Sequence, residues 1–418
     1  MKILIRNIKT LVQVREKSAG KVRGALMRDL PCLDNAWLLI KDGLIAGYGK
    51  METLPGQEHP GVDISIDASG RLVFPCWCDS HTHLVYAGSR EKEFTDRING
   101  LTYEEIAKRG GGILNSARKL QETPDEVLFS AALNRLEEIT FLGTGAVEIK
   151  SGYGLTLKDE LRMLRVIKKL KELTPLSIKA TFLGAHAVPS EYKGNKIKYV
   201  DLVVNEMLPA VAEEGLADFC DVFCEEGYFT KDETIRILTA AAGYGIKGKV
   251  HAEQLSHTGG VEAGVDCNAA SVDHLEYVND RDIALLAQSG VVPTLLPGAQ
   301  FFLGLPHPPA RKMIDSGLAV AVASDYNPGS SPSGNMNLMT ALCCIQYKMT
   351  PAEAVNASTM NSAFAMGVES SHGSITLGKT ANIFITEKMP GYEYLPYSFG
   401  SNLIDTVIIN GKIINKKK

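Results

Sequence analysis

The sequence predicts an α/β protein whose main part is a TIM-like (β/α)8 barrel, joined to a small β-sandwich domain built from the N- and C-terminal segments. Strand patterns fill both ends of the chain, whereas strand and helix patterns alternate in the middle. Histidine and acidic residues follow the middle strands, as they do at the active rim of such a barrel. The length of 418 residues fits a barrel of about 250 residues with a smaller second domain.

The two ends of the chain carry apolar or alternating runs bounded by turn signals. Asp42-Gly43 and Asn410-Gly411 are dipeptides typical of hairpin turns. The predicted strands lie within residues 2–14, 35–49, 62–74, 381–387 and 403–415. We therefore predict that residues 1–72 and 375–418 form one composite β-sandwich domain and that residues 73–374 form the barrel inserted into it.

The middle segment repeats a strand followed by a helix. Thr123 and Glu126 predict a capping box with Pro124 at the first helical position, and Thr230 and Glu233 predict a second helix start. Strands are expected within residues 71–83, 145–154, 177–189, 218–228, 246–254, 269–278, 291–298 and 319–332, with helices that include residues 124–139, 157–167, 199–211 and 280–288 and a short one near residue 311. This rhythm predicts eight parallel strands with right-handed crossovers.

Composition points to a metabolic role. The formal net charge of −4 provides no broad basic surface for nucleic acid or anionic lipid. No run reaches the roughly 18 apolar residues of a membrane span, and the N-terminus lacks a secretory pattern. The eight cysteines show no disulfide spacing, which favours free thiols in a reducing compartment. We expect a cytoplasmic protein with a small-molecule partner, no nucleic acid and no membrane.

The pair His81 and His83 is the strongest chemical signal. Residues two apart on a strand point to the same face, so both imidazoles can bind one metal ion. His251 and Asp325 follow other predicted strands and complete a ligand set that suits Zn²⁺ or Fe²⁺, which lowers the pKa of a bound water to about 7. Asp325 has the alternative of forming a turn before Asn327.

Other residues at the strand ends leave alternatives open. His186 is a ligand, a substrate contact or a core histidine, and His274 is the best remaining acid–base group because an unperturbed histidine has a pKa near 6.5. Lys150, close to Glu148, is either carbamylated to bridge two metals or an ion-pair partner. A ligand role for Cys76 and Cys78 is a minor alternative to packing in the core.

Three features indicate an anionic substrate. Arg90 lies seven positions after His83, and its guanidinium matches a carboxylate bidentately. The run from Asn327 to Ser331 is expected to present backbone N–H groups and hydroxyls to a carboxylate or a urea-like group. Tyr153 adds a phenol near another strand end. Each has a plainer interpretation as surface charge, turn or core aromatic, so their weight depends on their sharing one rim.

These motifs together resemble the amidohydrolase superfamily and, more narrowly, its imidazolonepropionase branch. The similarity spans residues 74–367 and rests on HTHLVYAGSREKEF, KRGGGI, VEIKSGYGL, FLGAHAVP, HAEQLS, VDHLEY and SDYNPGSSP. HTH alone marks only the superfamily, whereas DYNPGSSP, SGYGL and GGGI are specific to the branch. The resemblance implies hydrolysis of the cyclic amide 4-imidazolone-5-propionate to N-formimino-L-glutamate in histidine degradation.

The resemblance also implies roles for matching positions. The metal ligands would be His81, His83, His251 and Asp325, and the substrate contacts Arg90, Tyr153, His186, Gln254, Asn327, Gly329 and Ser330. Gln254 stands in the catalytic centre where some members carry Glu, and an amide cannot act as a general base. Cys76 replaces the glycine that is usual before the HTH motif, a difference that concerns packing.

We expect Asp325 to accept the proton of the attacking water, His274 to stabilise the oxyanion and Arg90 to hold the propionate. A homodimer is the expected assembly. One alternative is a purine or pyrimidine aminohydrolase, which has little need of a carboxylate clamp such as Arg90. A non-catalytic scaffold with the same fold is less favoured, because such proteins commonly lose metal ligands and all four are present here.

Overall fold

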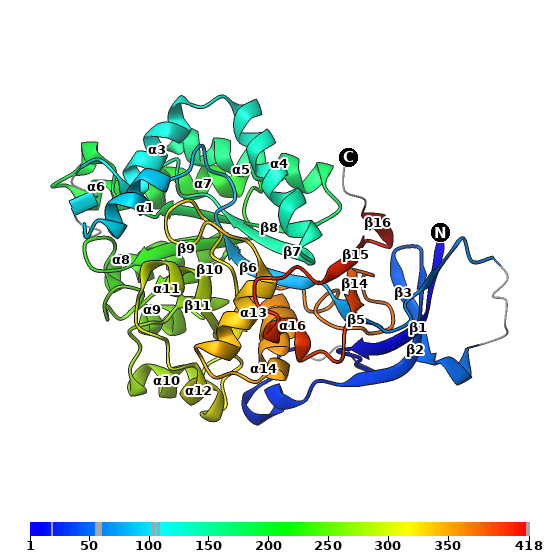
Figure 1. Ribbon diagram of the computed structural model, residues 1–418. Helices are drawn as coiled ribbons and strands as arrows, with labels where there is room; N and C mark the ends of the chain where they lie inside the picture. The colour runs from blue at the N-terminus through cyan, green and yellow to red at the C-terminus, as the bar shows by residue number, and fades with distance from the viewer. Residues whose placement is uncertain (18–19, 55–60, 102–104, 107–108, 415–418) are drawn as a thin grey trace.

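The computed structural model describes residues 1–17, 20–54, 61–101, 105–106 and 109–414. Within them the strands form two eight-stranded sheets, one a parallel barrel and the other mixed (Figure 1). The fold class predicted from the sequence is confirmed. No helix among the described residues is long and apolar enough to cross a membrane.

The barrel strands follow one another around the sheet in chain order. They are β6 (Trp77–Thr82), β7 (Thr144–Lys150), β8 (Ser177–Ala185), β9 (Phe219–Cys224), β10 (Lys247–Ala252), β11 (Ser271–His274), β12 (Val292–Leu295) and β13 (Ala321–Val322). Each neighbouring pair is parallel. A parallel bridge between Thr82 and Tyr326 joins the first strand to the segment after the last one, so the strand ends form a continuous rim.

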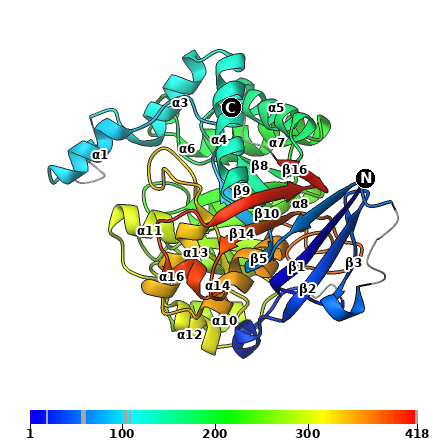
Figure 2. The ribbon, with the colours of Figure 1, turned by 45° about the vertical axis from the view of Figure 1, so that its right-hand side comes forward.

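Helices cover the outside of the barrel. They are α1 (Glu91–Ile98), α3 (Gly112–Glu122), α4 (Asp125–Phe141), α5 (Leu157–Leu173), α6 (Lys196–Leu202), α7 (Leu208–Glu213), α8 (Lys231–Gly243), α9 (Gly260–Asp266), α10 (Asp280–Ala287), α11 (Pro297–Leu303), α12 (Ala310–Asp315), α13 (Met336–Ile345), α14 (Pro351–Asn356), α15 (Ser362–Ala365) and α16 (Tyr394–Tyr397). A π-helical segment, Val203–Met207, joins α6 to α7. Figure 2 shows α1 projecting beyond α3 at the edge of the barrel.

The two predicted helix starts differ in outcome. The capping box of α8 is confirmed, because the Thr230 side chain accepts from the Glu233 backbone and the Glu233 side chain accepts in return. The capping box at Thr123 is wrong. Pro124 is the N-cap of α4 without a side-chain hydrogen bond, and the Thr123 hydroxyl donates to the Lys119 carbonyl at 2.6 Å instead. The short connection between α3 and α4 directs this hydroxyl backwards.

The mixed sheet combines both ends of the chain. Its strands are β1 (Lys2–Val12), β2 (Cys32–Lys41), β3 (Leu44–Lys50), β4 (Ile64–Asp67), β5 (Arg71–Pro75), β14 (Ile383–Lys388), β15 (Ile404–Ile409) and β16 (Lys412–Ile414). The antiparallel pair β5 and β14 joins the N-terminal part to the C-terminal part. Isoleucines from β1, β2, β3, β14 and β15 pack in one core between the strands, separate from the larger barrel core.

The chain passes from one sheet to the other at Cys76. Its N–H donates to the Asn382 carbonyl beside the mixed sheet, whereas the next N–H, of Trp77, donates to Gly143 beside the barrel. The single strand expected over residues 71–83 is therefore two strands in different sheets. β5 also extends past residue 72, the predicted domain limit; the domain limits otherwise stay a prediction.

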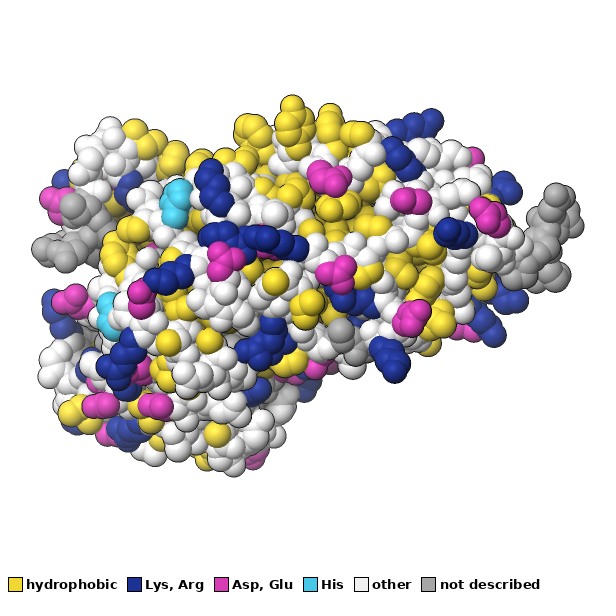
Figure 3. All heavy atoms as spheres, turned by 90° about the horizontal axis from the view of Figure 1, so that it is seen from below, with side chains coloured by type: hydrophobic (Ala, Val, Ile, Leu, Met, Phe, Trp, Pro, Cys, Tyr) yellow, Lys and Arg dark blue, Asp and Glu magenta, His cyan; other side chains and the backbone are white. Residues whose placement is uncertain are grey.

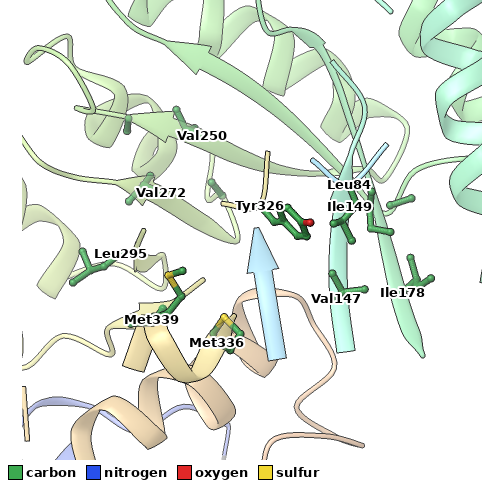
Figure 4. Close-up of a cluster of buried hydrophobic side chains, with 14 of the residues drawn as sticks. Leu84, Val147, Ile149, Ile178, Val250, Val272, Leu295, Tyr326, Met336 and Met339 are labelled. Carbon is green, nitrogen blue, oxygen red and sulfur yellow. The ribbon is translucent and has the colours of Figure 1, made fainter. Parts of the chain in front are cut away.

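The barrel core lies between the strands and the surrounding helices. Figure 4 shows Val147 and Ile149 on β7 and Met336 and Met339 on α13 within this cluster. Burial of apolar side chains on both faces is typical of parallel strands, and it leaves the strand ends as the place for polar groups.

Candidate active site

The predicted site residues lie at the carboxyl ends of the barrel strands. His81 and His251 are near the ends of β6 and β10, His274 ends β11, and Asp325 follows β13. His83, His251, His274 and Asp325 line one pocket, and His81 lies directly behind them. All the predicted substrate-contacting residues line this pocket, namely Arg90, Tyr153, His186, Gln254, Asn327, Gly329 and Ser330.

Four potential ligand atoms converge at the bottom of the pocket. His251 Nε2 lies 3.1 Å from His81 Nε2 and 3.4 Å from His83 Nε2. Asp325 Oδ1 lies 3.5 Å from both His81 Nε2 and His83 Nε2. Atoms bound tetrahedrally at 2.0–2.2 Å from one ion are separated by roughly 3.3–3.6 Å. A proton shared between two of these atoms accounts for only one of the four short distances. A single bound cation accounts for all four, so these residues fit a divalent metal.

Two buried aspartates, which the sequence analysis did not single out, contact the far nitrogens of these histidines. Asp273 Oδ2 accepts from His81 Nδ1 at 2.6 Å, and Asp221 Oδ2 lies 3.1 Å from His251 Nδ1. A carboxylate on one ring nitrogen leaves the other nitrogen unprotonated and free to bind metal. The available signal was a charged residue at an inward position of a buried strand.

Lys150 forms ion pairs rather than standing alone. Its ammonium lies 2.8 Å from both Glu148 Oε1 and Asp221 Oδ2, and all three side chains are fully buried. Burial opposes this charge, but the facing carboxylates outweigh burial and raise the pKa of Lys150. A protonated lysine cannot be carbamylated, so the structure favours the ion-pair alternative over a bridge between two metals.

His274 faces the buried carboxylate of Glu276. Its Nδ1 lies 3.9 Å from Glu276 Oε1, and neither carboxylate oxygen has a hydrogen-bond partner among the described residues. Burial disfavours the imidazolium, but Glu276, Asp325 and Asp273 together raise the pKa of His274. His274 and Leu275 have φ values of 89° and 75°, a strained conformation for residues with side chains and one common at functional sites.

His186 is neutral in this site. Burial lowers its pKa to about 3, and His251 adds to this effect. Its Nδ1 contacts the Gly152 carbonyl at 2.9 Å; because a carbonyl only accepts, Nδ1 carries the proton. Nε2 is therefore an acceptor. The ring stacks on His83 with centroids 5.2 Å apart, so His186 lies beside the ligand cluster and outside it.

Arg90 is the N-cap residue of α1, and its side chain is held by two neighbouring residues. Its Nε donates to the Ser116 hydroxyl at 3.0 Å, and one terminal nitrogen lies 3.6 Å from Glu93. Gly329 packs against the guanidinium so closely that an added Cβ would be 2.4 Å from Nη1. Only glycine therefore allows the guanidinium its observed position.

The loop after Asp325 uses its donors internally, contrary to the expectation from the sequence. The backbone N–H groups of Gly329 and Ser330 both donate to Asn327 Oδ1 at 2.8 Å. The Ser330 hydroxyl donates to Asp325 Oδ2 at 3.0 Å, and the Ser331 hydroxyl donates to the Ser324 carbonyl. An asparagine side chain at the centre of a turn accepts the turn's own backbone N–H groups. The loop therefore holds Asp325 in place, and its residues form a wall of the pocket.

The remaining wall is apolar and was missed from the sequence. The apolar residues that line the pocket together with the polar ones are Ile113, Phe223, Leu255 and Leu303.

Cys78 lies outside this pocket and packs with Ala146, Ala363, Met366 and Val368. Burial raises the pKa of its thiol to about 12. A neutral thiol in an apolar cluster does not support the minor alternative of a cysteine ligand.

Comparisons with known proteins cover nearly the whole chain. The sequence profile of the Amidohydrolase family matches residues 72–414. A protein named imidazolonepropionase from Christiangramia forsetii is 56% identical over 414 residues, which cover 99% of this chain and 100% of the relative. Another of that name, from Flavobacterium johnsoniae, is 57% identical and covers 98% and 99%; one from Parabacteroides distasonis is 44% identical and covers 99% and 98%.

Solved structures share the fold at much lower identity. A zinc-bound adenosine deaminase from Xanthomonas campestris superposes with a TM-score of 0.72 at 14% identity, over 98% of this chain and 92% of that one. A zinc complex of atrazine chlorohydrolase from Arthrobacter aurescens gives 0.73 at 16% identity, over 98% and 94%. At such identities the similarity concerns the fold alone.

Proposed function

Because the chain belongs to the amidohydrolase family, and within it to the imidazolonepropionases, we propose that it hydrolyses 4-imidazolone-5-propionate to N-formimino-L-glutamate in histidine degradation. Identity of 56–57% over almost the full length of the relatives supports this activity. The observation that carries it in the structure is one pocket that is lined by Arg90 and ends at the cluster of three histidines and Asp325. Such a pocket suits a small substrate with a carboxylate.

We propose that the cluster binds a divalent metal ion and that His81, His83, His251 and Asp325 are its ligands. Three imidazoles and one carboxylate suit zinc or iron. When bound, such an ion polarises a carbonyl and makes water acidic enough to attack at neutral pH. The choice between the two metals is testable by measuring metal content and reconstitution.

Asp325 and His274 would manage the protons. Asp325 directs Oδ1 toward His81 and His83, so Oδ2, next to the Ser330 hydroxyl, is the atom that would hold the proton of the attacking water. Burial raises the pKa of Asp325, which makes it a better base. His274 has Nδ1 toward Glu276 and would donate from Nε2 to the oxyanion at the ring carbonyl.

The remaining residues would orient the ring. Arg90 would bind the propionate carboxylate, with Tyr153, Asn327, Gly329 and Ser330 on the surrounding walls. His186 would accept a ring N–H at Nε2, because its Nδ1 is occupied by the Gly152 carbonyl. Gln254 would hydrogen-bond the ring without taking a proton. The apolar side chains limit water around the reacting bond.

Loss of imidazolonepropionate, followed spectroscopically, tests the assignment. Metal-replete protein should consume the substrate rapidly, and His81→Ala should reduce this to the uncatalysed rate. Arg90→Gln separates the main alternative, since a purine or pyrimidine aminohydrolase would keep its KM. Absence of turnover in protein with a full metal content would contradict the proposed substrate and direct attention to other cyclic amides and aminoheterocycles.

We further propose a cytoplasmic homodimer. The charge of −4 and the free cysteines support the cytoplasm as the compartment.

An exposed apolar groove supports the homodimer. Ile345, Tyr397 and Phe399 are exposed beside this groove, and Figure 3 shows hydrophobic side chains gathered on the face seen from below. Apolar patches of this kind mark interaction surfaces. Tyr397→Glu should shift the molar mass from dimer to monomer in light scattering; an unchanged mass would exclude this surface.

A further inference from the structure

Five fully buried ionisable side chains connect the two histidines below the ligand cluster. We call them the charge ring; its members alternate in sign and are Asp273, Lys249, Glu148, Lys150 and Asp221. They come from four strands of the barrel, β7, β9, β10 and β11. No predicted catalytic step uses them, so their presence requires another explanation.

The contacts run without interruption from His81 to His251. Asp273 Oδ2 accepts from His81 Nδ1 at 2.6 Å and lies 3.7 Å from Lys249 Nζ. Lys249 Nζ lies 4.0 Å from Glu148 Oε2 and donates to the Ser80 carbonyl at 2.6 Å. These contacts form one half of the ring, from the first histidine to its central glutamate.

The other half returns to the second histidine. Glu148 Oε1 accepts from Lys150 Nζ at 2.8 Å, and Lys150 Nζ lies 2.8 Å from Asp221 Oδ2. Asp221 Oδ2 lies 3.1 Å from His251 Nδ1, and its other oxygen accepts from the His251 backbone N–H at 3.2 Å. The Nε2 atoms of His251 and His81 are 3.1 Å apart, which closes the circuit at the metal position.

Stability alone is a poor explanation for such a ring. Buried ion pairs cost about as much in desolvation as they return, and apolar replacements of similar size are often neutral or stabilising. What ionic contacts do provide is a fixed position and tautomer for an imidazole. The three carboxylates and two ammoniums, with Asp325, leave a formal excess of two negative charges, which a divalent cation balances.

We propose that Lys249, Glu148 and Lys150 are positioning residues for the metal centre. They fix the carboxylates of Asp273 and Asp221, and through them the directions in which His81 and His251 present Nε2. Loss of one ring member lets a carboxylate rotate away from its histidine. The histidine then presents its lone pair less accurately, and metal affinity falls although every ligand is retained.

Metal binding by the full-length protein tests this without any substrate. Apoprotein of Glu148→Gln and of Lys249→Met, both close in size to the native residues, should bind Zn²⁺ about 10- to 100-fold more weakly in competition with a chromogenic chelator. The visible spectrum of the Co²⁺ form should also change in both variants, since it reports ligand geometry. These readouts stay informative even if the proposed substrate is wrong.

Lys379→Met is the matched control. Lys379 is another buried lysine, whose ammonium donates to the carbonyls of Glu369 and His372 outside the ring. It should lower the melting temperature and leave Zn²⁺ affinity and the Co²⁺ spectrum unchanged. The proposal is overturned if the two ring variants keep native Zn²⁺ affinity, or if Lys379→Met loses affinity as much as they do.

Discussion

The position of Arg90 illustrates how single residues in this site depend on neighbours that carry no chemistry. Ser116, on α3, accepts from Arg90 Nε, and Glu93 accepts from the Gly112 N–H at the start of the same helix. The Gly-rich run before α3 therefore connects to the proposed carboxylate clamp. Gly111 permits this close approach, because an added Cβ there would lie 3.1 Å from the Glu93 carboxyl carbon.

Ser116→Ala should weaken binding of the propionate without slowing the chemistry. The guanidinium loses the acceptor that fixes its plane, so KM should rise about 5- to 10-fold, equivalent to roughly 1–1.4 kcal/mol and within the range for one hydrogen bond, while kcat stays nearly constant. Steady-state kinetics measures both. An imidazolone without the propionate serves as the control and should show no difference between the two proteins.

Glu276→Gln should lower kcat while leaving KM nearly unchanged. Glu276 is the buried carboxylate that faces His274 Nδ1, and the neutral isosteric amide no longer favours the imidazolium that would donate to the oxyanion. We expect a decrease in kcat of about 10- to 100-fold, within the range for one acid–base group. A variant with native kcat would show that Glu276 has no part in holding His274.

At the level of elements, loops and sheet contacts are organised by buried polar groups. Glu160 on α5 accepts from the N–H groups of Gly152, Gly154 and Leu155, which shapes the turn that carries Tyr153.

His372 joins the two sheets. Its Nε2 lies 2.9 Å from the Ser177 hydroxyl at the start of β8 and 3.2 Å from Asn382 Nδ2 before β14.

The His372 contact predicts a loss of stability in acid. Burial lowers the pKa of His372 to about 4, from an ordinary value of 6.5, so the folded state favours the neutral ring. The contribution of the neutral ring to the free energy of unfolding is complete above pH 6.5 and is lost as the pH falls toward 4. At pH 5 the free energy of unfolding should be about 2 kcal/mol lower than at pH 7. Urea unfolding at pH 7 and pH 5 measures it. His372→Gln should show a smaller pH difference; an equal difference would contradict the assignment.

For the whole molecule, the metal should contribute to stability as well as to activity. An ion that binds only the folded state stabilises it by about 2.7 kcal/mol at a concentration 100 times its Kd. Removal with a chelator should abolish turnover and lower Tm, and added Zn²⁺ or Fe²⁺ should restore both. His81→Ala is the control, and its Tm should respond weakly to chelator. A native Tm in metal-free protein would argue against tight coupling between the site and the barrel.

The sequence by itself determined the order of the elements and which residue types end the strands. Alternation over residues 2–14 and the βα rhythm depend only on local spacing, which decides the faces of a strand or helix. That is why the barrel and the placement of His81, His83, His251 and Asp325 on one rim could be predicted. The capping box at Thr123 failed because Thr123 is the C-cap of α3, and its hydroxyl donates to the carbonyl four residues earlier in that helix.

Tertiary structure decided which buried groups meet. Asp273 and His81 are 192 positions apart and meet only when the barrel closes, whereas Asp221 and His251 are 30 apart and meet through the pairing of β9 with β10. The same holds for the change of sheet at Cys76, where backbone partners come from residues 382 and 143. A hydrogen bond requires both partners within about 3 Å, and between distant segments only the folded chain sets that distance.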